Sequence, residues 1–301
     1  MTATDARTST AAAPTRPAPA APTRRSRRGH PLRTGLYHLG AGGLSVLWLL
    51  PIALVVVTSF RSFDDISANG MGSLPHSFTL GNFADAWTDG GEMHAMINSL
   101  VVTIPTVLLS LALAAMAAFA LSRYRLPLRR TILLVMLAGN LLPPQILLVP
   151  VAKLSEVLGV FDTLPALIAV QVGFGLGFYT FVLYGFMRAI PNEIQQAAVV
   201  DGANVVQVFL RVILPLTRPA LAALGALAFT WVFNDLLWSI TVLRTGSKMP
   251  VTAALIGLQG LYVSQWNLIA AGSVIAAIPT VAVFLRFQRH FIAGLTLGAV
   301  K

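Results

Sequence analysis

The residues of this sequence best suited to contact a ligand are polar side chains inside otherwise apolar stretches. Asn234 and Asp235 form an adjacent, strongly polar pair deep in such a stretch. An ionisable group in that setting is costly unless it faces a pathway or a partner. Two roles fit the pair: contact with a transported substrate or ion, or a structural hydrogen-bonded site between helices.

Amide and aromatic side chains in the same stretches are further candidates. Aromatic faces and amide groups suit ligands with hydroxyl-bearing rings. Such aromatic residues also serve as interface anchors or packing residues, and this alternative stays open. The candidate path therefore consists of Asn234 and Asp235 with Gln171, Tyr179, Tyr184, Trp231 and Trp238.

Patterns typical of catalysis or of a bound cofactor are missing from the sequence. The five histidines have no metal-ligand spacing, and there is no cysteine, so no metal site is predicted. Gly173, Gly175 and Gly177 lie inside an apolar stretch with no strand before them, which indicates close helix packing or local unwinding rather than a nucleotide site. No nucleophile–base pair or pair of acids supports an intramembrane enzyme. We expect a non-catalytic chain that binds no cofactor itself.

Composition indicates that these candidates are carried by membrane-spanning helices. Of the 301 residues, 56% are hydrophobic and 11% are charged, far from the balance of a soluble domain. Apolar stretches long enough to cross a bilayer recur along the chain. The prediction is an all-α polytopic membrane protein with six transmembrane helices, at about residues 37–60, 95–121, 131–152, 164–187, 220–243 and 268–287.

The first 33 residues differ from the rest of the chain. They are rich in Ala, Pro, Thr and Arg and are predicted to be a disordered basic tail. The arginines at 24, 25, 27 and 28 could instead begin a signal peptide, but the next apolar stretch is too long and lacks a small-residue cleavage site. Residues 34–301 then form one transmembrane domain, with kinks at Pro51, Pro105 and Pro279 and the strongest at Pro143 and Pro144.

The placement of basic residues predicts the orientation of the spans. Six spans put both termini on one side, and seventeen of the 21 Lys and Arg residues fall on that side. Basic residues are enriched in cytoplasmic loops, so both termini are predicted to be cytoplasmic. The net charge of +10 thus follows from topology, and no nucleic-acid partner is expected.

A distinctive cytoplasmic segment, residues 190–219, separates the fourth and fifth predicted spans. Pro191 suits a first helical position, and Asp201-Gly202 supplies a stop with a residue that adopts positive φ. A second helix is predicted from about Asn204 to Leu214, ending before Pro215. This pattern fits either docking on a partner or an amphipathic helix lying on lipid.

The segment resembles the EAA loop of ABC importer permeases. Ala197, Ala198, Gly202, Ile213 and Pro215 match the pattern in register, and Asp201-Gly202-Ala203 has the form common in sugar permeases. Gln196 departs from the pattern, because it stands where the family usually has Glu. An amide keeps an acceptor oxygen but loses the charge, so a salt bridge to an ATPase at this position is in doubt.

Shorter matches extend the resemblance over nearly all of the chain after the tail, and it fits the carbohydrate-uptake branch, specifically the maltose-type second permease. They are Asn98-Ser99-Leu100, residues 117–123, Phe161-Asp162-Thr163, Asn234-Asp235 with Trp238, and residues 293–301. The resemblance implies the type I ABC importer permease fold, with a cytoplasmic coupling helix between spans 4 and 5.

The resemblance also implies partners and a location. It implies a permease subunit for a sugar or oligosaccharide in a bacterial cell membrane, paired with a second permease and served by an extracytoplasmic solute-binding protein. A cytoplasmic ABC ATPase dimer would use ATP and Mg²⁺, since this chain has no Walker sequence. The alternative function is an ion-coupled secondary transporter that uses Asp235.

Overall fold

A computed structural model of the chain describes residues 31–88, 90–258 and 265–297, with side chains for 37–88, 90–258 and 265–288. The regular elements of this described part are all helical. Nearly all of the predicted tail, and residues 298–301 of the C-terminal match, lie outside it. The chain divides into two units, Met1–Leu50 and Pro51–Lys301, which are described separately.

The described part of the first unit is helical. It belongs to α1 (Pro31–Ser59), which continues into the second unit. Side chains from Tyr37 to Leu50 are exposed and mostly apolar. A helix that is apolar on all sides suits a lipid environment, as predicted for the first span.

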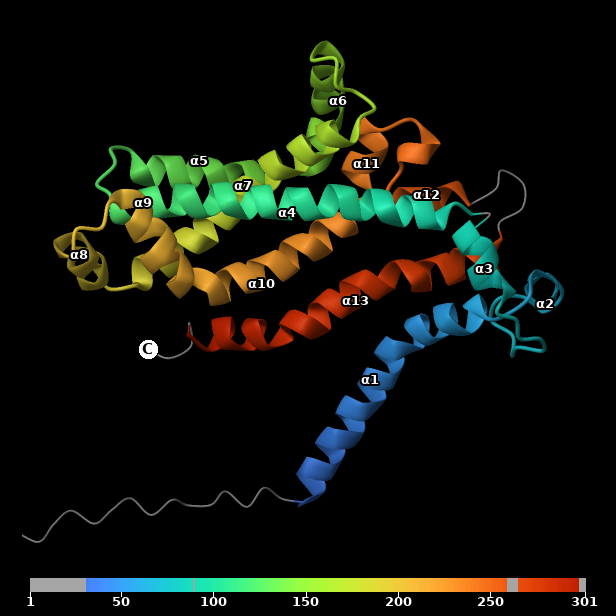
Figure 1. The fold of residues 1–301 in the computed structure, drawn as a ribbon. Helices are drawn as coiled ribbons and strands as arrows, with labels where there is room; N and C mark the ends of the chain where they lie inside the picture. The colour runs from blue at the N-terminus through green and yellow to red at the C-terminus, as the bar shows by residue number, and fades with distance from the viewer. Residues whose placement is uncertain (1–30, 89, 259–264, 298–301) are drawn as a thin grey trace, which may run out of the picture. The chain divides into compact units, whose positions relative to one another are not determined.

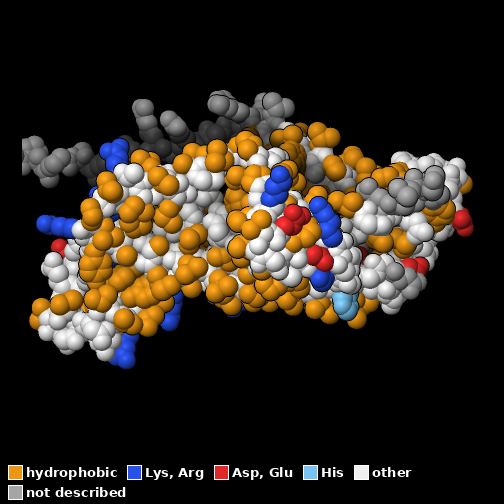
Figure 2. Space-filling model, turned by 90° about the horizontal axis from the view of Figure 1, so that it is seen from above, with side chains coloured by type: hydrophobic (Ala, Val, Ile, Leu, Met, Phe, Trp, Pro, Cys, Tyr) orange, Lys and Arg blue, Asp and Glu red, His pale blue; other side chains and the backbone are white. Residues whose placement is uncertain are grey.

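The second unit is built on three long helices that pack along one another. They are α4 (Glu92–Arg123), α7 (Leu164–Ala189) and α10 (Leu214–Phe233), with α5 (Arg129–Leu141) against α7 and α13 (Trp266–Leu297) against α10 (Figure 1). Small residues such as Ala114 and Ala118 let α4 approach its neighbours closely, and Leu183, Met187 and Ile213 fill the core beside them. Figure 2 shows that hydrophobic side chains cover much of one face, as expected for a protein in lipid.

The third predicted span is broken rather than continuous. After α5, the chain continues through η1 (Pro144–Leu147) and α6 (Leu148–Val157). This segment is bent by 91° relative to α5. The kink predicted at Pro143 and Pro144 is therefore present as a full break, because neither proline has an N–H to continue the ladder and Leu142 is extended, with ψ 134°. Within the described residues, five helices are long and apolar enough to span a membrane, or six when this bent pair counts as one span.

Two predicted helix boundaries are wrong. The predicted helix over 220–243 is interrupted, since α10 ends at Phe233 and α11 (Leu237–Val242) begins after a short break. The predicted stop before Pro215 is missing, because α9 (Val205–Gln207) runs through η2 (Val208–Ile213) into α10. η2 is a π-helical turn, in which the Leu214 N–H donates to the carbonyl oxygen of Phe209. This wider turn accommodates a proline that would end a regular α-helix.

The second unit has short helices at both of its ends. α2 (Phe63–Asn69), α3 (Gly81–Thr88), α11, η3 (Gly246–Lys248) and α12 (Val251–Gly257) were not predicted as separate elements. Among them α2, α3 and α12 lie toward one end, while α8 (Asn192–Val200) and α9 lie at the opposite end (Figure 1).

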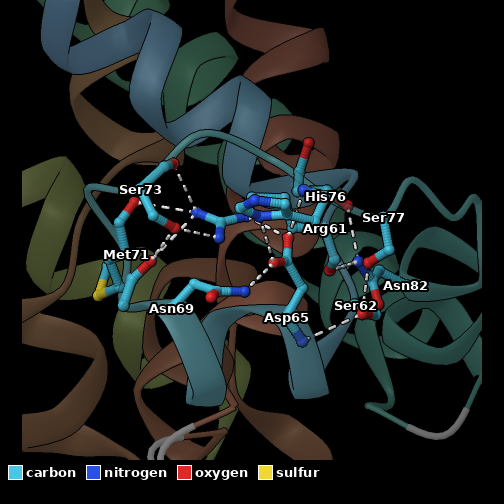
Figure 3. A network of polar contacts seen from close by, with 11 residues as sticks. Arg61, Ser62, Asp65, Asn69, Met71, Ser73, His76, Ser77 and Asn82 are labelled. Carbon is cyan, nitrogen blue, oxygen red and sulfur yellow. Dashed lines mark hydrogen bonds and ion pairs between the residues drawn. The ribbon is translucent and has the colours of Figure 1, made fainter.

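A buried arginine organises the end that carries α2 and α3 (Figure 3). Arg61 is fully buried, and its Nε donates to Oδ2 of Asp65 at 2.8 Å. Its Nη1 donates to the carbonyl oxygens of Gly70, Met71 and Ser73. The Arg61 guanidinium holds the pKa of the Asp65 carboxyl well below its usual range. From the sequence alone, Arg61 is only one of the few basic residues placed on the side opposite the termini.

Candidate functional site

The segment between α7 and α10 has the predicted helix and turn. α8 runs from Asn192 to Val200, so Pro191 stands at the N-cap, one residue before the first helical position predicted for it; Asp201 is the C-cap, and Gly202 follows with φ 84°. The N–H of Gly202 donates to the Val199 carbonyl at 3.0 Å, and that of Ala203 to the Ala198 carbonyl at 2.9 Å. Gly202 thus occupies a left-handed conformation in which a side chain is strained.

The chain after this turn is fixed by a capping box. The Asn204 N–H donates to Oε1 of Gln207, and the Gln207 N–H donates to Oδ1 of Asn204, both at 2.9 Å. Two otherwise unpaired donors are satisfied at the start of α9. The direction in which the chain leaves the turn is therefore set by local hydrogen bonds.

The eight residues predicted for coupling divide into two groups. Gln196, Ala197, Asp201 and Gly202 are exposed, as are Val199 and Val200 beside them. Ile213 is fully buried in the core, whereas Ala198, Ala203 and Pro215 are partly buried. The first group presents a surface with amide, carboxylate and apolar contacts, and the second group fixes that surface to the helix bundle.

Arg123, at the end of α4, is a residue of this site whose role sequence reasoning missed. Its guanidinium donates to the carbonyl oxygens of Met187 and Ile190 and to Oδ1 of Asn192. From the sequence it is one of the cytoplasmic basic residues and the last residue of the 117–123 match, with no contact assigned to it. The available signal was its position as the last residue of a predicted span, where a basic side chain can reach the end of a neighbouring helix.

Most of the predicted path residues line a single cavity. Its volume is about 280 Å³, and its wall includes Gln171, Tyr179, Trp231, Asp235 and Trp238. The broken third span contributes to the wall from the other side, through Gly139, Asn140, Leu142 and Pro144. Residues that are distant in the sequence therefore meet where two helices are interrupted.

Asp235 lies at the interruption between α10 and α11 and holds the start of α11. Its Oδ2 accepts hydrogen bonds from the Ser239 N–H at 3.0 Å and from Gln171 Nε2 at 3.3 Å. Its backbone oxygen accepts from Thr252 Oγ1 at 2.7 Å. The Asp235 carboxylate therefore caps the start of α11 and also borders the cavity.

Gln171 supplies an unused acceptor at the cavity wall. The side chain is 7% exposed, and its Oε1 is buried without a hydrogen-bond partner in the described part of the chain. A buried unpaired carbonyl oxygen is costly.

Two of the candidates have other surroundings. Asn234 is exposed, and its Nδ2 donates to the Thr230 carbonyl and to Thr280 Oγ1 of α13. Tyr184 does not line the cavity: its ring has the guanidinium groups of Arg129 and Arg188 6.0 Å from its centre. These positions suit links between helices rather than ligand contact.

Among the glycines of α7, Gly177 serves packing against α5. α7 is a continuous helix, so the predicted alternative of local unwinding is not observed. A Cβ at Gly177 would collide with the carbonyl oxygen of Met136 in α5, whereas a Cβ at Gly173 would meet nothing within 4 Å. Gly177 therefore permits the close approach of α5 that forms one side of the cavity.

The described residues hold no group of three or more His, Asp or Glu side chains that could bind a metal ion. The chemistry available at the two sites is hydrogen bonding, aromatic contact and docking of an exposed helix.

Comparison with known proteins gives consistent matches. The family model described as "Binding-protein-dependent transport system inner membrane component" matches residues 96–296. The diacetylchitobiose uptake system permease protein NgcG of Streptomyces coelicolor is 31% identical over 85% of this chain and 85% of its own length. The trehalose transport system permease protein SugB of Mycobacterium tuberculosis is 31% identical over 87% of this chain and 94% of its own.

Solved structures show the same fold. A chain from a bacterial ABC transporter involved in the import of the acidic polysaccharide alginate superposes with a TM-score of 0.74 at 22% identity. The match covers 86% of this chain and 96% of that one. A second match, with a TM-score of 0.64 and 14% identity, comes from an alginate ABC transporter in complex with a pentasaccharide-bound periplasmic protein.

Proposed function

Because the chain belongs to the family of binding-protein-dependent transport system inner membrane components, the permeases of ABC importers, we propose that it carries a sugar or oligosaccharide across the bacterial cell membrane. It does so as one of two permease subunits. Curated relatives named for diacetylchitobiose and trehalose support this class of substrate. The observation that carries the proposal is the convergence of Gln171, Trp231 and Trp238 on one cavity.

The cavity has the chemistry that a sugar needs. The indole groups of Trp231 and Trp238 offer flat apolar faces, while Gln171 Oε1 accepts a hydroxyl hydrogen. A second cavity of about 580 Å³ shares Gly139, Asn140, Leu142 and Phe174 with the first, so the two lie next to each other along the broken third span. A mobile substrate needs a route of this kind with few strong contacts, because tight binding would slow its release.

Energy comes from a separate ATPase that docks on the exposed face of α8. Gln196, Ala197 and Gly202 are exposed there, and the chain has no phosphate-binding sequence of its own. A cytoplasmic ATPase dimer binds ATP and Mg²⁺, and its closure moves the segment and tilts the helices between inward-open and outward-open arrangements. Gln196 makes this contact through an uncharged amide.

The remaining partners act at the other end of the unit. An extracytoplasmic solute-binding protein delivers the sugar near α2, α3 and α12, which lie opposite α8 (Figure 1). Both termini are cytoplasmic in this arrangement, in keeping with the distribution of basic residues.

The ion-coupled alternative has weaker support. It requires Asp235 to exchange an ion or a proton during transport. Oδ2 of Asp235 already accepts hydrogen bonds from the N–H and Oγ of Ser239 and from Gln171. Loss of these bonds would uncap α11, so Asp235 is poorly placed as an exchanging group.

The proposal is tested by reconstituting the chain with its partner subunits and loaded binding protein, with and without Gly202→Trp. A Cβ at Gly202 would meet nothing within 4 Å, so a Trp side chain there leaves the helix bundle untouched at its base and projects into the docking face. We expect substrate-stimulated ATP hydrolysis and uptake to fall at least about tenfold while the complex still assembles.

Gly70→Trp is the matched control. Gly70 has φ 81° against 84° for Gly202, and a Cβ there would also meet nothing within 4 Å. The control carries similar backbone strain at the opposite end of the unit and should retain basal ATP hydrolysis. Transport by this chain alone, driven by an ion gradient and unaffected by Gly202→Trp, would refute the importer proposal.

A further inference from the structure

Arg123 ties three helices together at one point. Its Nη2 donates to the carbonyl oxygen of Met187 in α7 at 2.6 Å. Its Nη1 donates to the carbonyl oxygen of Ile190 at 3.1 Å and to Oδ1 of Asn192, the first residue of α8, at 2.9 Å. One side chain of α4 therefore holds the last turn of α7 and the first residue of α8.

The chemistry of this contact suits a guanidinium group. The carbonyl oxygens at the end of α7 carry partial negative charge, which a cation stabilises; that of Met187 accepts only the Ile190 N–H, at 3.2 Å, from its own helix end. The planar fork of Arg can reach several acceptors in fixed directions, whereas the ammonium group of Lys is a single point. No carboxylate pairs with Arg123 in the described part of the chain. Its positive charge is therefore stabilised by backbone and amide oxygens.

The other end of α4 is tied to a different segment. Asn98 Nδ2 donates to the carbonyl oxygens of Ser247 and Met249, and the Val251 N–H donates to Ser99 Oγ. α4, a helix of 32 residues, carries both sets of contacts. The helix runs through Pro105 without interruption, so displacement at one end can reach the other.

We infer that Arg123 is the positioning residue through which α8 and α4 move together, so that ATPase closure at α8 reaches the 247–251 segment at the far end of α4. This inference rests on the proposed docking of an ATPase on α8. Arg123 itself touches neither nucleotide nor substrate. Without its guanidinium, α8 would move on its own and ATP would be hydrolysed with little transport.

Pairs of spin labels can report whether α8 and α4 move together. The natural chain has no cysteine, so Met116→Cys in α4 and Ile194→Cys in α8, both exposed and neither among the residues assigned to docking, place one label on each helix. Distance distributions are measured in the full complex, at rest and trapped with ATP. Uptake per ATP hydrolysed is measured in the unlabelled complexes.

Three substitutions are compared. Arg123→Met removes the charge and keeps much of the volume. Asn192→Ala removes only the side-chain acceptor and leaves the carbonyl contacts intact. Arg125→Met is the matched control, because Arg125 is exposed two residues further on and has no hydrogen bond or ion pair among the described residues.

We expect the distance distribution to keep its mean and width between the two states in the unsubstituted complex and in Arg125→Met. In Arg123→Met the distribution should be broader at rest and should shift with ATP, and uptake per ATP should fall about tenfold or more. Asn192→Ala should show a smaller change in the same direction. A purely structural role for Arg123 predicts a different result. The substitution would then lower the amount of assembled complex without changing how the distance distribution responds to ATP.

An Arg123→Met distribution identical to that of Arg125→Met overturns the inference, whatever the transport result. Unchanged uptake per ATP in Arg123→Met, when the unsubstituted complex transports, also overturns it and leaves the proposed function standing. An unsubstituted complex with no ATP-driven uptake contradicts the proposed function instead, and the resting distributions then still decide whether Arg123 holds α8.

Discussion

Asp162 shows how a single residue joins two segments outside the spans. Its Oδ1 accepts the backbone N–H groups of Arg244 at 2.8 Å and Thr245 at 3.0 Å, and its Oδ2 accepts from Lys248 Nζ at 3.0 Å. The residue has φ 59°, which Asp tolerates better than most side chains. These hydrogen bonds, led by the Arg244 N–H, hold the pKa of the Asp162 carboxyl well below its ordinary value of 3.8.

Asp162→Asn should lower the melting temperature of the protein in detergent, on the order of 5 °C at neutral pH. An ionised carboxylate with a depressed pKa contributes stability above its unfolded pKa, and this contribution is lost as the pH falls through the folded pKa. The gap between natural protein and variant should therefore be constant above about pH 5 and shrink below about pH 4. A gap that widens on acidification would contradict this account.

Gln171→Leu tests whether one polar side chain of the cavity wall contributes to substrate binding. The substitution removes both the unpaired Oε1 and the hydrogen bond from Nε2 to Asp235 Oδ2, so we expect the KM for uptake to rise roughly tenfold while basal ATP hydrolysis is retained. Asn234→Leu is the control, since Asn234 is polar and close in sequence to Asp235 but does not line the cavity. Equal effects of the two substitutions on KM would argue against the cavity as the substrate site.

At the scale of elements, the contact between α5 and α7 depends on one glycine. Gly177→Ala would bring a Cβ against the carbonyl of Met136 and within 2.7 Å of Asn140 Nδ2. Overpacking of this kind costs about 1–3 kcal/mol. The melting temperature should fall, and the α5 side of the cavity should be displaced.

Gly173→Ala, one turn earlier in the same helix, is its matched control. The new methyl group would meet nothing within 4 Å, and Ala is a better helix former than Gly by about 1 kcal/mol. We expect unchanged or slightly higher stability in the same thermal melt. Destabilisation of similar size by both substitutions would indicate that the helix backbone, rather than the α5 contact, requires glycine.

For the whole molecule, the central prediction is its orientation in the membrane. Val200 and Leu74 are highly exposed, and they belong to segments at opposite ends of the second unit. Since the natural chain has no cysteine, Val200→Cys and Leu74→Cys can each be labelled singly with a membrane-impermeant maleimide. Leu74→Cys should react in intact cells, and Val200→Cys only after permeabilisation. The reverse pattern would place α8 outside and refute the proposed ATPase docking.

Local sequence properties determined much of this protein. A span is recognised from the length of an apolar run, and a turn such as Asp201-Gly202 from the conformational freedom of one glycine. Both properties belong to neighbouring residues, so the membrane class, the approximate spans and the helix and turn at residues 191–202 could be predicted. The resemblance of residues 196–215 to a known loop added the expected role.

Only the tertiary structure decided which residues meet. Whether the chain stops at Pro215 or continues through a π-helical turn, and where it breaks near Asp235, depends on packing against other helices. The burial of Arg61 and the contacts of Arg123 with α7 and α8 likewise join residues that are distant along the chain or on different elements. A buried polar group must find its partners in three dimensions, and residue type alone does not name them.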